Sequence, residues 1–358
     1  MQWLSVSQRT VLFQIIYLLA CWYLLTGCAL AAILPAASAT DDKQCQSNCA
    51  LGSGAQGLRI LVEPDMGPAP IVSAIRAARQ TVFMEMYLLS NKSIIAALEE
   101  DANQGLDVRV MLEQHPYGGT PLSPQETLAR LQAAGVKTRF SNPDFPLTHE
   151  KGLLIDNAVA YIMTSNMTNA ALGVGNYTLN REYDIVDTNT QDVQAIAAIF
   201  QADWQRGTVS FNAPDLVVSP LNARLAFNLL IASASQTLLV TAEEMQDSGI
   251  EQDLIAAAQR AVNVQVILPT PGGGSSDSNL NGILAIKQGG VHVREDPRLY
   301  MHAKTLIVDG QRAFVGSENI STPSLDQNRE LGIIIADGSV LQTLQQTFQK
   351  DWNDSQSV

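Results

Sequence analysis

An internal duplication constrains the fold of this chain more than any other feature of its sequence. The stretch "HEKGLLIDNA" at residues 149–158 returns as "HAKTLIVDGQ" at residues 302–311, and both contain the pattern His-x-Lys-x-x-x-x-Asp. Upstream, "LDVRVMLEQ" at 106–114 corresponds to "VNVQVILPT" at 262–270, and downstream each copy closes on Phe-x-x-Asp-Trp. Because these segments recur in the same order, the sequence predicts two homologous halves.

Apolar, strand-like runs alternate with helical stretches in both halves. Residues 91–105 carry Ile94, Ile95 and Leu98 at helical spacing and end on a glycine, and residues 250–261 occupy the same place in the second half. This alternation predicts an α/β fold in which each half forms a mixed, largely parallel sheet flanked by helices.

The halves are expected at residues 57–210 and 216–358, related by a pseudo-two-fold axis. Residues 40–56 are polar and show no periodicity, so we interpret them as a linker. Pockets commonly lie where two folded bodies meet. The duplicated motif therefore predicts an active site at the interface between the halves, built from both copies.

The N-terminal segment differs from the rest of the chain. Val11 to Leu34 contains no charged residue and follows Arg9, which predicts that residues 1–39 are a signal peptide or a membrane anchor. "AASA", ending at Ala39, is a small-residue cleavage site, whereas "LTGC" would make Cys28 the lipidated residue of a lipobox. The apolar run, about 24 residues long, could also span a bilayer uncut. All three interpretations predict an exported protein, secreted or held in a bacterial cell envelope.

The repeated motif has the chemistry of a phosphate site. Alternate residues of a strand point to one face, so His149 shares a face with Lys151, and His302 with Lys304. An ammonium group repels a metal cation, which argues against a metal site. Beside a phosphate, in contrast, the lysine supplies a fixed positive charge and the histidine supplies a nucleophile or a proton.

Hydrogen-bonding residues follow each copy of the motif at identical offsets. Thr164 and Asn166 stand 8 and 10 residues after the first motif aspartate, and Ser317 and Asn319 stand at the same offsets after the second. We expect these four side chains to bind the non-bridging oxygens of the phosphate.

The tripeptide Asn-Arg-Glu also occurs twice, at residues 180–182 and 328–330. A carboxylate that accepts from the far ring nitrogen of a histidine fixes the tautomer and strengthens the nucleophile. Glu182 and Glu330 are the candidates for this role.

Together, the two motifs, the "GSEN" stretch at 316–319 and the trailing glutamates resemble the phospholipase D superfamily. The resemblance covers residues 57–358, nearly everything after the N-terminal segment. The first copy departs from the family pattern, because Met163 stands where the second copy has Gly316 and Thr164 replaces serine. Threonine keeps the hydroxyl, so the phosphate contact is expected to survive.

The resemblance implies a metal-independent phosphodiester transfer that needs no cofactor. One histidine attacks phosphorus and forms a phosphohistidine, and the other protonates the leaving oxygen and then activates water or an alcohol. The family's N-terminal histidine is usually the nucleophile, which assigns attack to His149 and acid–base catalysis to His302, although the residues alone are symmetric. Asp156 and Asp309 follow apolar-leaning positions, so we expect them to point away from the substrate and to support the strand and its turn.

Charge helps to rank the substrates. The formal net charge is −13, and proteins that hold long nucleic acids usually present a basic face, so a nucleic-acid partner is not expected. The favoured function is an enzyme acting on phospholipids at a membrane surface, either a phospholipase D or a phosphatidyltransferase of the cardiolipin synthase type, without an obligate protein partner. The alternatives are an exported nuclease and an inactive envelope-binding protein. Head-group preference and the choice between hydrolysis and transfer stay open.

Overall fold

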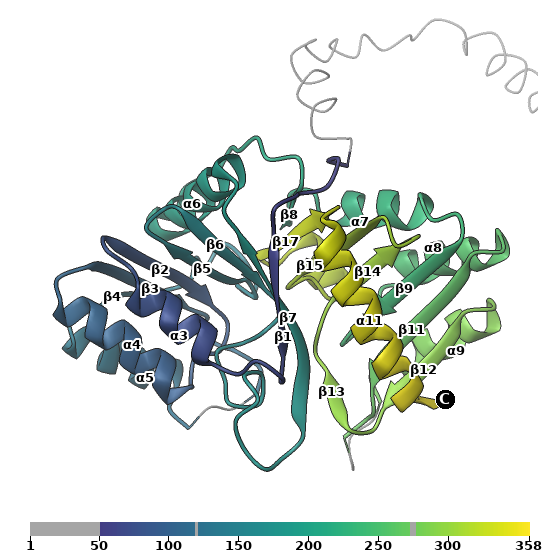
Figure 1. The fold of residues 1–358 in the computed structure, drawn as a ribbon, viewed down its shortest axis with the longest axis horizontal. Helices are drawn as coiled ribbons and strands as arrows, with labels where there is room; N and C mark the ends of the chain where they lie inside the picture. The colour runs from purple at the N-terminus through teal and green to yellow at the C-terminus, as the bar shows by residue number, and fades with distance from the viewer. Residues whose placement is uncertain (1–50, 119–120, 273–276) are drawn as a thin grey trace, which may run out of the picture. The chain divides into compact units, whose positions relative to one another are not determined.

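The chain forms two 8-stranded sheets, one centred on each half, in the computed structural model, which describes residues 51–118, 121–272 and 277–358 (Figure 1). The elements of the first half are β1 (Arg59–Glu63), α3 (Ala69–Arg76), β2 (Thr81–Met86), α4 (Lys92–Asn103), β3 (Asp107–Leu112), α5 (Pro124–Ala133), β4 (Lys137–Phe140), β5 (Lys151–Ile155), β6 (Val159–Met163), β7 (Leu179–Asp187) and α6 (Thr190–Gln205). The elements of the second half are β8 (Leu216–Ser219), α7 (Ala223–Ala232), β9 (Thr237–Thr241), β10 (Met245–Gln246), α8 (Ser248–Gln259), β11 (Asn263–Pro269), α9 (Leu280–Gln288), β12 (His292–Asp296), β13 (Leu299–Met301), β14 (Thr305–Val308), β15 (Arg312–Gly316), β16 (Ile320–Ser321), α10 (Thr322–Asp326), β17 (Glu330–Ile335), α11 (Gly338–Asp354) and β18 (Gln356–Ser357).

The two sheets have corresponding strand orders. The first runs β1-β7-β6-β5-β2-β3-β4, and the second runs β18-β12-β11-β9-β14-β15-β17-β8. Strand β13 of the second half pairs in parallel with β7 of the first, and Figure 1 shows the two strands side by side between the sheets. The predicted α/β fold with two corresponding halves is confirmed.

The sheets are less parallel than the sequence suggested. Only β2, β3 and β4 in the first sheet's main path, and β9, β11 and β12 in the second, run parallel to their neighbours. The other pairings of both main paths are antiparallel. The expectation of a largely parallel sheet is therefore wrong in this detail. Helical crossovers join the parallel strands, whereas short turns join β5 to β6 and β14 to β15 and impose antiparallel pairing.

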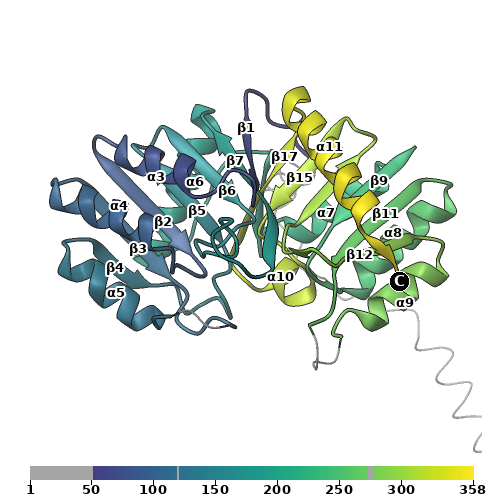
Figure 2. The same ribbon diagram turned by 60° about the horizontal axis from the view of Figure 1, so that its bottom comes forward.

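Three apolar clusters hold the helices to the sheets. Helices α3, α4 and α5 bury residues against one face of the first sheet, and α7, α8 and α9 do the same on the second. Figure 2 shows α4 and α5 at the first sheet and α8 and α9 at the second, on opposite sides of the view. The third cluster unites α6, α11 and the remaining faces of both sheets. The halves therefore share this third cluster, which lies between the two sheets.

Local sequence explains the helix predicted at residues 91–105. The Asn91 side chain accepts hydrogen bonds from the backbone N–H groups of Ser93 and Ile94, which caps the first turn of α4. Ile94, Ile95 and Leu98 are buried beneath that turn, as their spacing predicts.

Part of the stretch interpreted as a linker is attached to the second half. Gly52 donates from its backbone N–H to the carbonyl of Pro214, and Ala55 forms a bridge with Ile335 of β17. The predicted signal peptide or anchor, residues 1–39, lies outside the described residues. Within the described ranges, no helix is long and apolar enough to cross a bilayer.

Each motif aspartate stabilises the hairpin turn that follows its strand. Asp156 and Asp309 adopt left-handed backbone conformations with φ of 53° and 51°. Their carboxylates accept backbone N–H groups from the segment before β2 or β9, at distances of 2.7–3.2 Å, namely Arg79, Gln80 and Thr81, and Ser235, Gln236 and Thr237. This placement fits the expected structural role.

Ion pairs cross between the halves in a reciprocal pattern. Arg181 of the first half binds Asp351 of the second, with Nε 2.7 Å from Oδ2, and Arg329 binds Asp203, with Nε 2.9 Å from Oδ2. All four side chains are buried. Each aspartate belongs to a Phe-x-x-Asp-Trp motif and each arginine to an Asn-Arg-Glu motif, so the duplicated sequence fastens one half to the other.

Candidate active site

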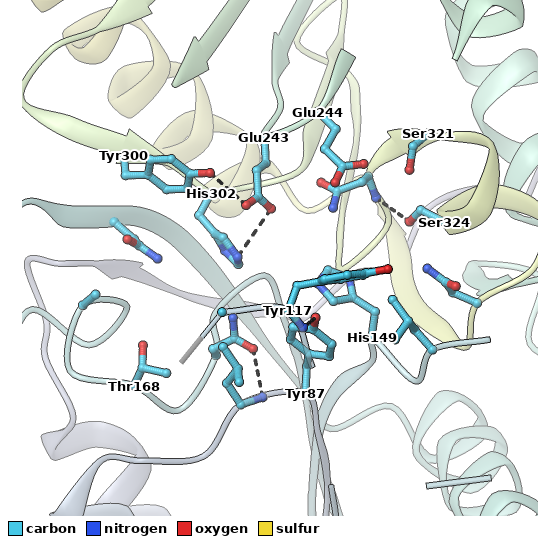
Figure 3. Close-up of a pocket in the computed structure, with 18 of the residues that line it drawn as sticks. Tyr87, Tyr117, His149, Thr168, Glu243, Glu244, Tyr300, His302, Ser321 and Ser324 are labelled. Carbon is cyan, nitrogen blue, oxygen red and sulfur yellow. Dashed lines mark hydrogen bonds and ion pairs between the residues drawn. The ribbon is translucent and has the colours of Figure 1, made fainter. Parts of the chain in front are cut away.

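A cavity of about 940 Å³ opens between the two halves (Figure 3). His149 and His302 both line it, one from each half. Backbone hydrogen bonds between the halves fix the positions of both histidines. The N–H of His149 donates to the carbonyl of Arg329, and the N–H of Ala303, next to His302, donates to the carbonyl of Arg181. The structure therefore brings the two predicted histidines into one site.

Each histidine is oriented by a glutamate of the opposite half. His149 Nδ1 lies 2.9 Å from Oε2 of Glu330, and His302 Nδ1 lies 2.7 Å from Oε1 of Glu182. Both glutamates are fully buried. A carboxylate at Nδ1 keeps a proton on that nitrogen, which directs Nε2 toward the reaction. Each His–Glu pair therefore contains one residue from each half, so neither pair can form without both halves.

The glutamates are themselves held in place. Glu182 accepts hydrogen bonds from Oγ1 of Thr164 and Nδ2 of Asn180, and Glu330 accepts one from Oγ of Ser324. Burial would raise the pKa of Glu330, but the nearby His149 and Lys151 lower it below its ordinary value. Glu330 is therefore a carboxylate at neutral pH.

The electrostatic surroundings keep His149 neutral. Burial is the main cause that lowers its pKa below 6.5, and Lys151 and Lys304 lower it further, against the opposing effect of Glu330. A neutral imidazole with the proton on Nδ1 carries its lone pair on Nε2. His149 therefore has the protonation state of a nucleophile at neutral pH.

The two motif lysines are buried and anchored to their own segments. Lys151 Nζ donates to the carbonyl of His149 at 2.7 Å, and Lys304 Nζ donates to the carbonyl of His302 at 2.5 Å. Burial, followed by repulsion from Lys304, lowers the pKa of Lys151 to about 7. An anionic phosphate beside Lys151 would favour its charged form.

The structure separates the four predicted phosphate-binding residues into two groups. Asn166 and Asn319 line the cavity. Thr164 and Ser317 do not, because β6 and β15 end just before them and the chain turns. Both are fully buried, and their hydroxyls accept the backbone N–H groups of the residues that follow the glutamates. A phosphate-binding role does not fit the placement of Thr164 and Ser317; they support β7 and β17 instead.

Two residues beside the histidines break the symmetry of the site, and the motif did not reveal their roles. Tyr87 follows β2, and its ring lies edge-on to His149 with centroids 4.6 Å apart. Glu243 follows β9 at the corresponding position, and its Oε2 lies 2.7 Å from Lys304 Nζ and 3.5 Å from His302 Nε2. Figure 3 shows both residues beside their histidines. The sequence did hold a signal, because "TVFMEMYLL" at 81–89 corresponds to "TLLVTAEEM" at 237–245 in the repeat, and this alignment pairs Tyr87 with Glu243.

Tyrosines form much of the cavity's outer wall. Tyr117, Tyr177 and Tyr300 line the cavity, and they are 79%, 54% and 38% exposed. Tyr117 and Tyr177 lie on the loops that follow β3 and β6. We refer to these three residues as the tyrosine rim.

Among the described residues, three buried carboxyl groups lie close enough together to hold a metal ion. The oxygens of Glu85, Glu150 and Asp203 lie within 4.8 Å of one another. Burial raises the pKa of Glu150 to about 8, so this carboxyl is largely protonated at neutral pH, and Arg329 pairs with Asp203. A proton and a guanidinium thus provide the positive charge that the cluster needs. None of the three lines the catalytic cavity.

Known proteins of similar sequence and fold share this architecture. The family model described as "Cardiolipin synthase, PLD-like domain" matches residues 71–204 and 229–352. A protein of Bacillus subtilis named probable cardiolipin synthase YwiE is 24% identical over 335 residues, which cover 80% of this chain. The cardiolipin synthase of Clostridium perfringens (strain SM101) is 23% identical over 335 residues, which cover 78% of this chain. The chain spans 64% of the first relative's length and 67% of the second's.

A solved structure supports the fold independently. The phosphatidylserine synthase of Haemophilus influenzae superposes with a TM-score of 0.64 at 14% identity, covering 89% of this chain and 92% of that one. The resemblance to the phospholipase D superfamily is therefore confirmed, and the chain belongs to the family of cardiolipin synthase, phospholipase D-like domains.

Proposed function

We propose that this protein transfers phosphatidyl groups between alcohols, through a phosphohistidine, with phospholipids as its substrates. The single observation that carries the proposal is the crossed pair of His–Glu contacts in one cavity. Two histidines at one phosphate can divide attack and proton transfer between them. The names of the relatives favour transfer to an alcohol over hydrolysis, with water as the competing acceptor.

In the first step, Nε2 of His149 attacks phosphorus. The P–N bond forms while the bond from phosphorus to the head-group oxygen breaks, and His302 gives a proton from Nε2 to that oxygen. We expect the charge on the non-bridging oxygens to be stabilised by Asn166 and Asn319, which line the cavity. We expect the same of Lys151 and Lys304, which do not line it but lie directly behind the histidines, donating to their carbonyls.

In the second step, an acceptor hydroxyl attacks the phosphohistidine. His302, now neutral, takes the hydroxyl proton on Nε2, and the P–N bond to His149 breaks. The products are a new phosphodiester and the starting forms of both histidines. No redox change occurs, and the proton that His302 gave to the departing head group is replaced by the one that it takes from the acceptor hydroxyl.

Two features support a lipid substrate at a membrane surface. The three residues of the tyrosine rim line the cavity and are exposed, and tyrosine suits the boundary between apolar and aqueous surroundings. In addition, the uncharged segment from Val11 to Leu34 has the composition of an export signal or anchor. We therefore propose that the protein is exported and acts at the cell envelope.

The test uses the purified full-length protein in EDTA. Phosphatidylglycerol, phosphatidylcholine and single-stranded DNA are offered separately, and glycerol or ethanol is then added as an acceptor. The expected result is release of lipid head groups, and a new phosphatidyl alcohol when the acceptor is present. His149→Ala and His302→Ala should each abolish the reaction.

Other outcomes would contradict the proposal. DNA cleavage with untouched lipids would assign a nuclease. Hydrolysis without any transfer, at high acceptor concentration, would assign a phospholipase. Lipid turnover that persists in His149→Ala would show that the activity comes from another site or a contaminant.

A further inference from the structure

The two catalytic histidines occupy equivalent places in the repeat but meet different neighbours. Nδ1 of His302 faces Glu182 at 2.7 Å, and its Nε2 faces Glu243 at 3.5 Å. Carboxylates only accept hydrogen bonds, so a carboxylate at each nitrogen favours a proton on both. Both ring nitrogens of His302 thus face a carboxylate oxygen, and Lys304 Nζ lies 3.4 Å from its Nδ1.

His149 has a carboxylate at one nitrogen alone. Its Nδ1 contacts Glu330, whereas its Nε2 makes no hydrogen bond to any residue within the described ranges. The position of Glu243 is taken here by Tyr87, whose phenol cannot balance a full positive charge. The asymmetry therefore comes from one position of the repeat.

We propose that Glu243 is a positioning residue that holds His302 doubly protonated and so commits it to donating the proton, which leaves the attack on phosphorus to His149. This inference rests on the proposed transfer chemistry. It adds a residue that lies outside both His-x-Lys motifs and both Asn-Arg-Glu motifs.

The surroundings of Glu243 keep it charged. Burial alone would raise its pKa, but His302 and Lys304, together with the Lys304 hydrogen bond, hold the pKa of Glu243 well below its ordinary value. The hydroxyl of Tyr300 donates to its Oε1 at 3.1 Å, so both oxygens are engaged. The charged or titratable groups around His302 are Glu182 on β7, Glu243 and Glu244 after β9, Tyr300 on β13, Lys304 on its own segment, and His149 and Lys151 of the first half.

Glu243 also gives the two lysines different hydrogen-bond partners. Lys304 commits one donor to Glu243 and one to the carbonyl of His302, whereas Lys151 commits one to the carbonyl of His149. Glu243 therefore pairs with Lys304, whereas Lys151 has no ion-pair partner among the described residues.

The first test measures protonation without any substrate. The imidazole ¹⁵N spectrum of the full chain contains signals from four histidines, and the His302→Gln spectrum identifies that of His302. At pH 7 the wild type should show both nitrogens of His302 protonated. In Glu243→Gln, which keeps the side-chain size, the signal should move toward the form with one proton.

The second test compares leaving groups. An alkyl phosphodiester needs a proton on its leaving oxygen, whereas p-nitrophenolate leaves without one. Glu243→Gln should slow turnover of the alkyl diester by about 10- to 100-fold and that of the p-nitrophenyl diester by less than about threefold. The matched control is Glu244→Gln, which removes a carboxylate from the same wall and should leave the ratio of the two rates unchanged.

Two results would overturn the inference: a singly protonated His302 in the wild type at pH 7, or equal losses with both diesters in Glu243→Gln. The second pattern would indicate a purely structural role. If simple diesters react but phospholipids do not, the proposed function fails while the role of Glu243 is still decided. If no diester reacts, the ¹⁵N spectra decide it alone.

Discussion

At the scale of single residues, the site depends on protonation states that burial and neighbouring charges set. His149 is enclosed and flanked by lysines, so its pKa lies below 6.5. A nucleophilic histidine must be neutral, and it loses activity as the pH falls through its pKa. The acid limb of the kcat/KM profile should therefore lie below pH 6.5, and an acid limb clearly above that value would contradict the assignment.

The same scale shows what the sequence could predict. His149, His302 and the two glutamates are found from the spacing of the repeated motifs, although the structure places both histidines just before β5 and β14 rather than on these strands. The spacing did not reveal which glutamate serves which histidine, since this depends on how the halves cross. It also assigned phosphate binding to Thr164, which lies just after the end of β6 at Met163, is fully buried and does not line the cavity.

At the scale of elements, the duplicated motifs join the two halves through buried ion pairs. Strand β7 supplies Arg181 to Asp351 of α11, and Asp203 of α6 receives Arg329. Removing one member of a buried pair leaves an uncompensated charge. Arg329→Met should therefore lower the free energy of unfolding by about 3–5 kcal/mol, as measured by urea denaturation.

The double variant Asp203→Asn with Arg329→Met provides the control for this pair. It removes both charges, so it should recover part of the stability lost in the single variant. A loss below about 1 kcal/mol for Arg329→Met would show that the pair behaves like an exposed one. The sequence indicated the fold class at this scale, but it overestimated the parallel share, because antiparallel pairings outnumber parallel ones in the main path of both sheets.

At the scale of the whole molecule, the cavity mouth should decide how the enzyme meets its substrate. Replacing Tyr117 and Tyr177 with serine removes two exposed aromatic rings from the tyrosine rim. Activity on phospholipid vesicles should fall by about tenfold, because the variant can no longer bury these aromatic rings in the membrane–water interface. Activity on a short-chain lipid below its micellar concentration should stay within about twofold. Equal losses on both substrates would place the tyrosines in the catalytic step instead.

The central claim is that two halves form one transfer site in which His149 carries the phosphatidyl group. The most direct measurement is to quench the full-length protein under alkaline conditions during turnover of phosphatidylglycerol, and to map the covalent adduct by mass spectrometry. The account predicts an adduct on the peptide that contains His149. An adduct on the His302 peptide, or steady turnover with no adduct on either histidine, would contradict it.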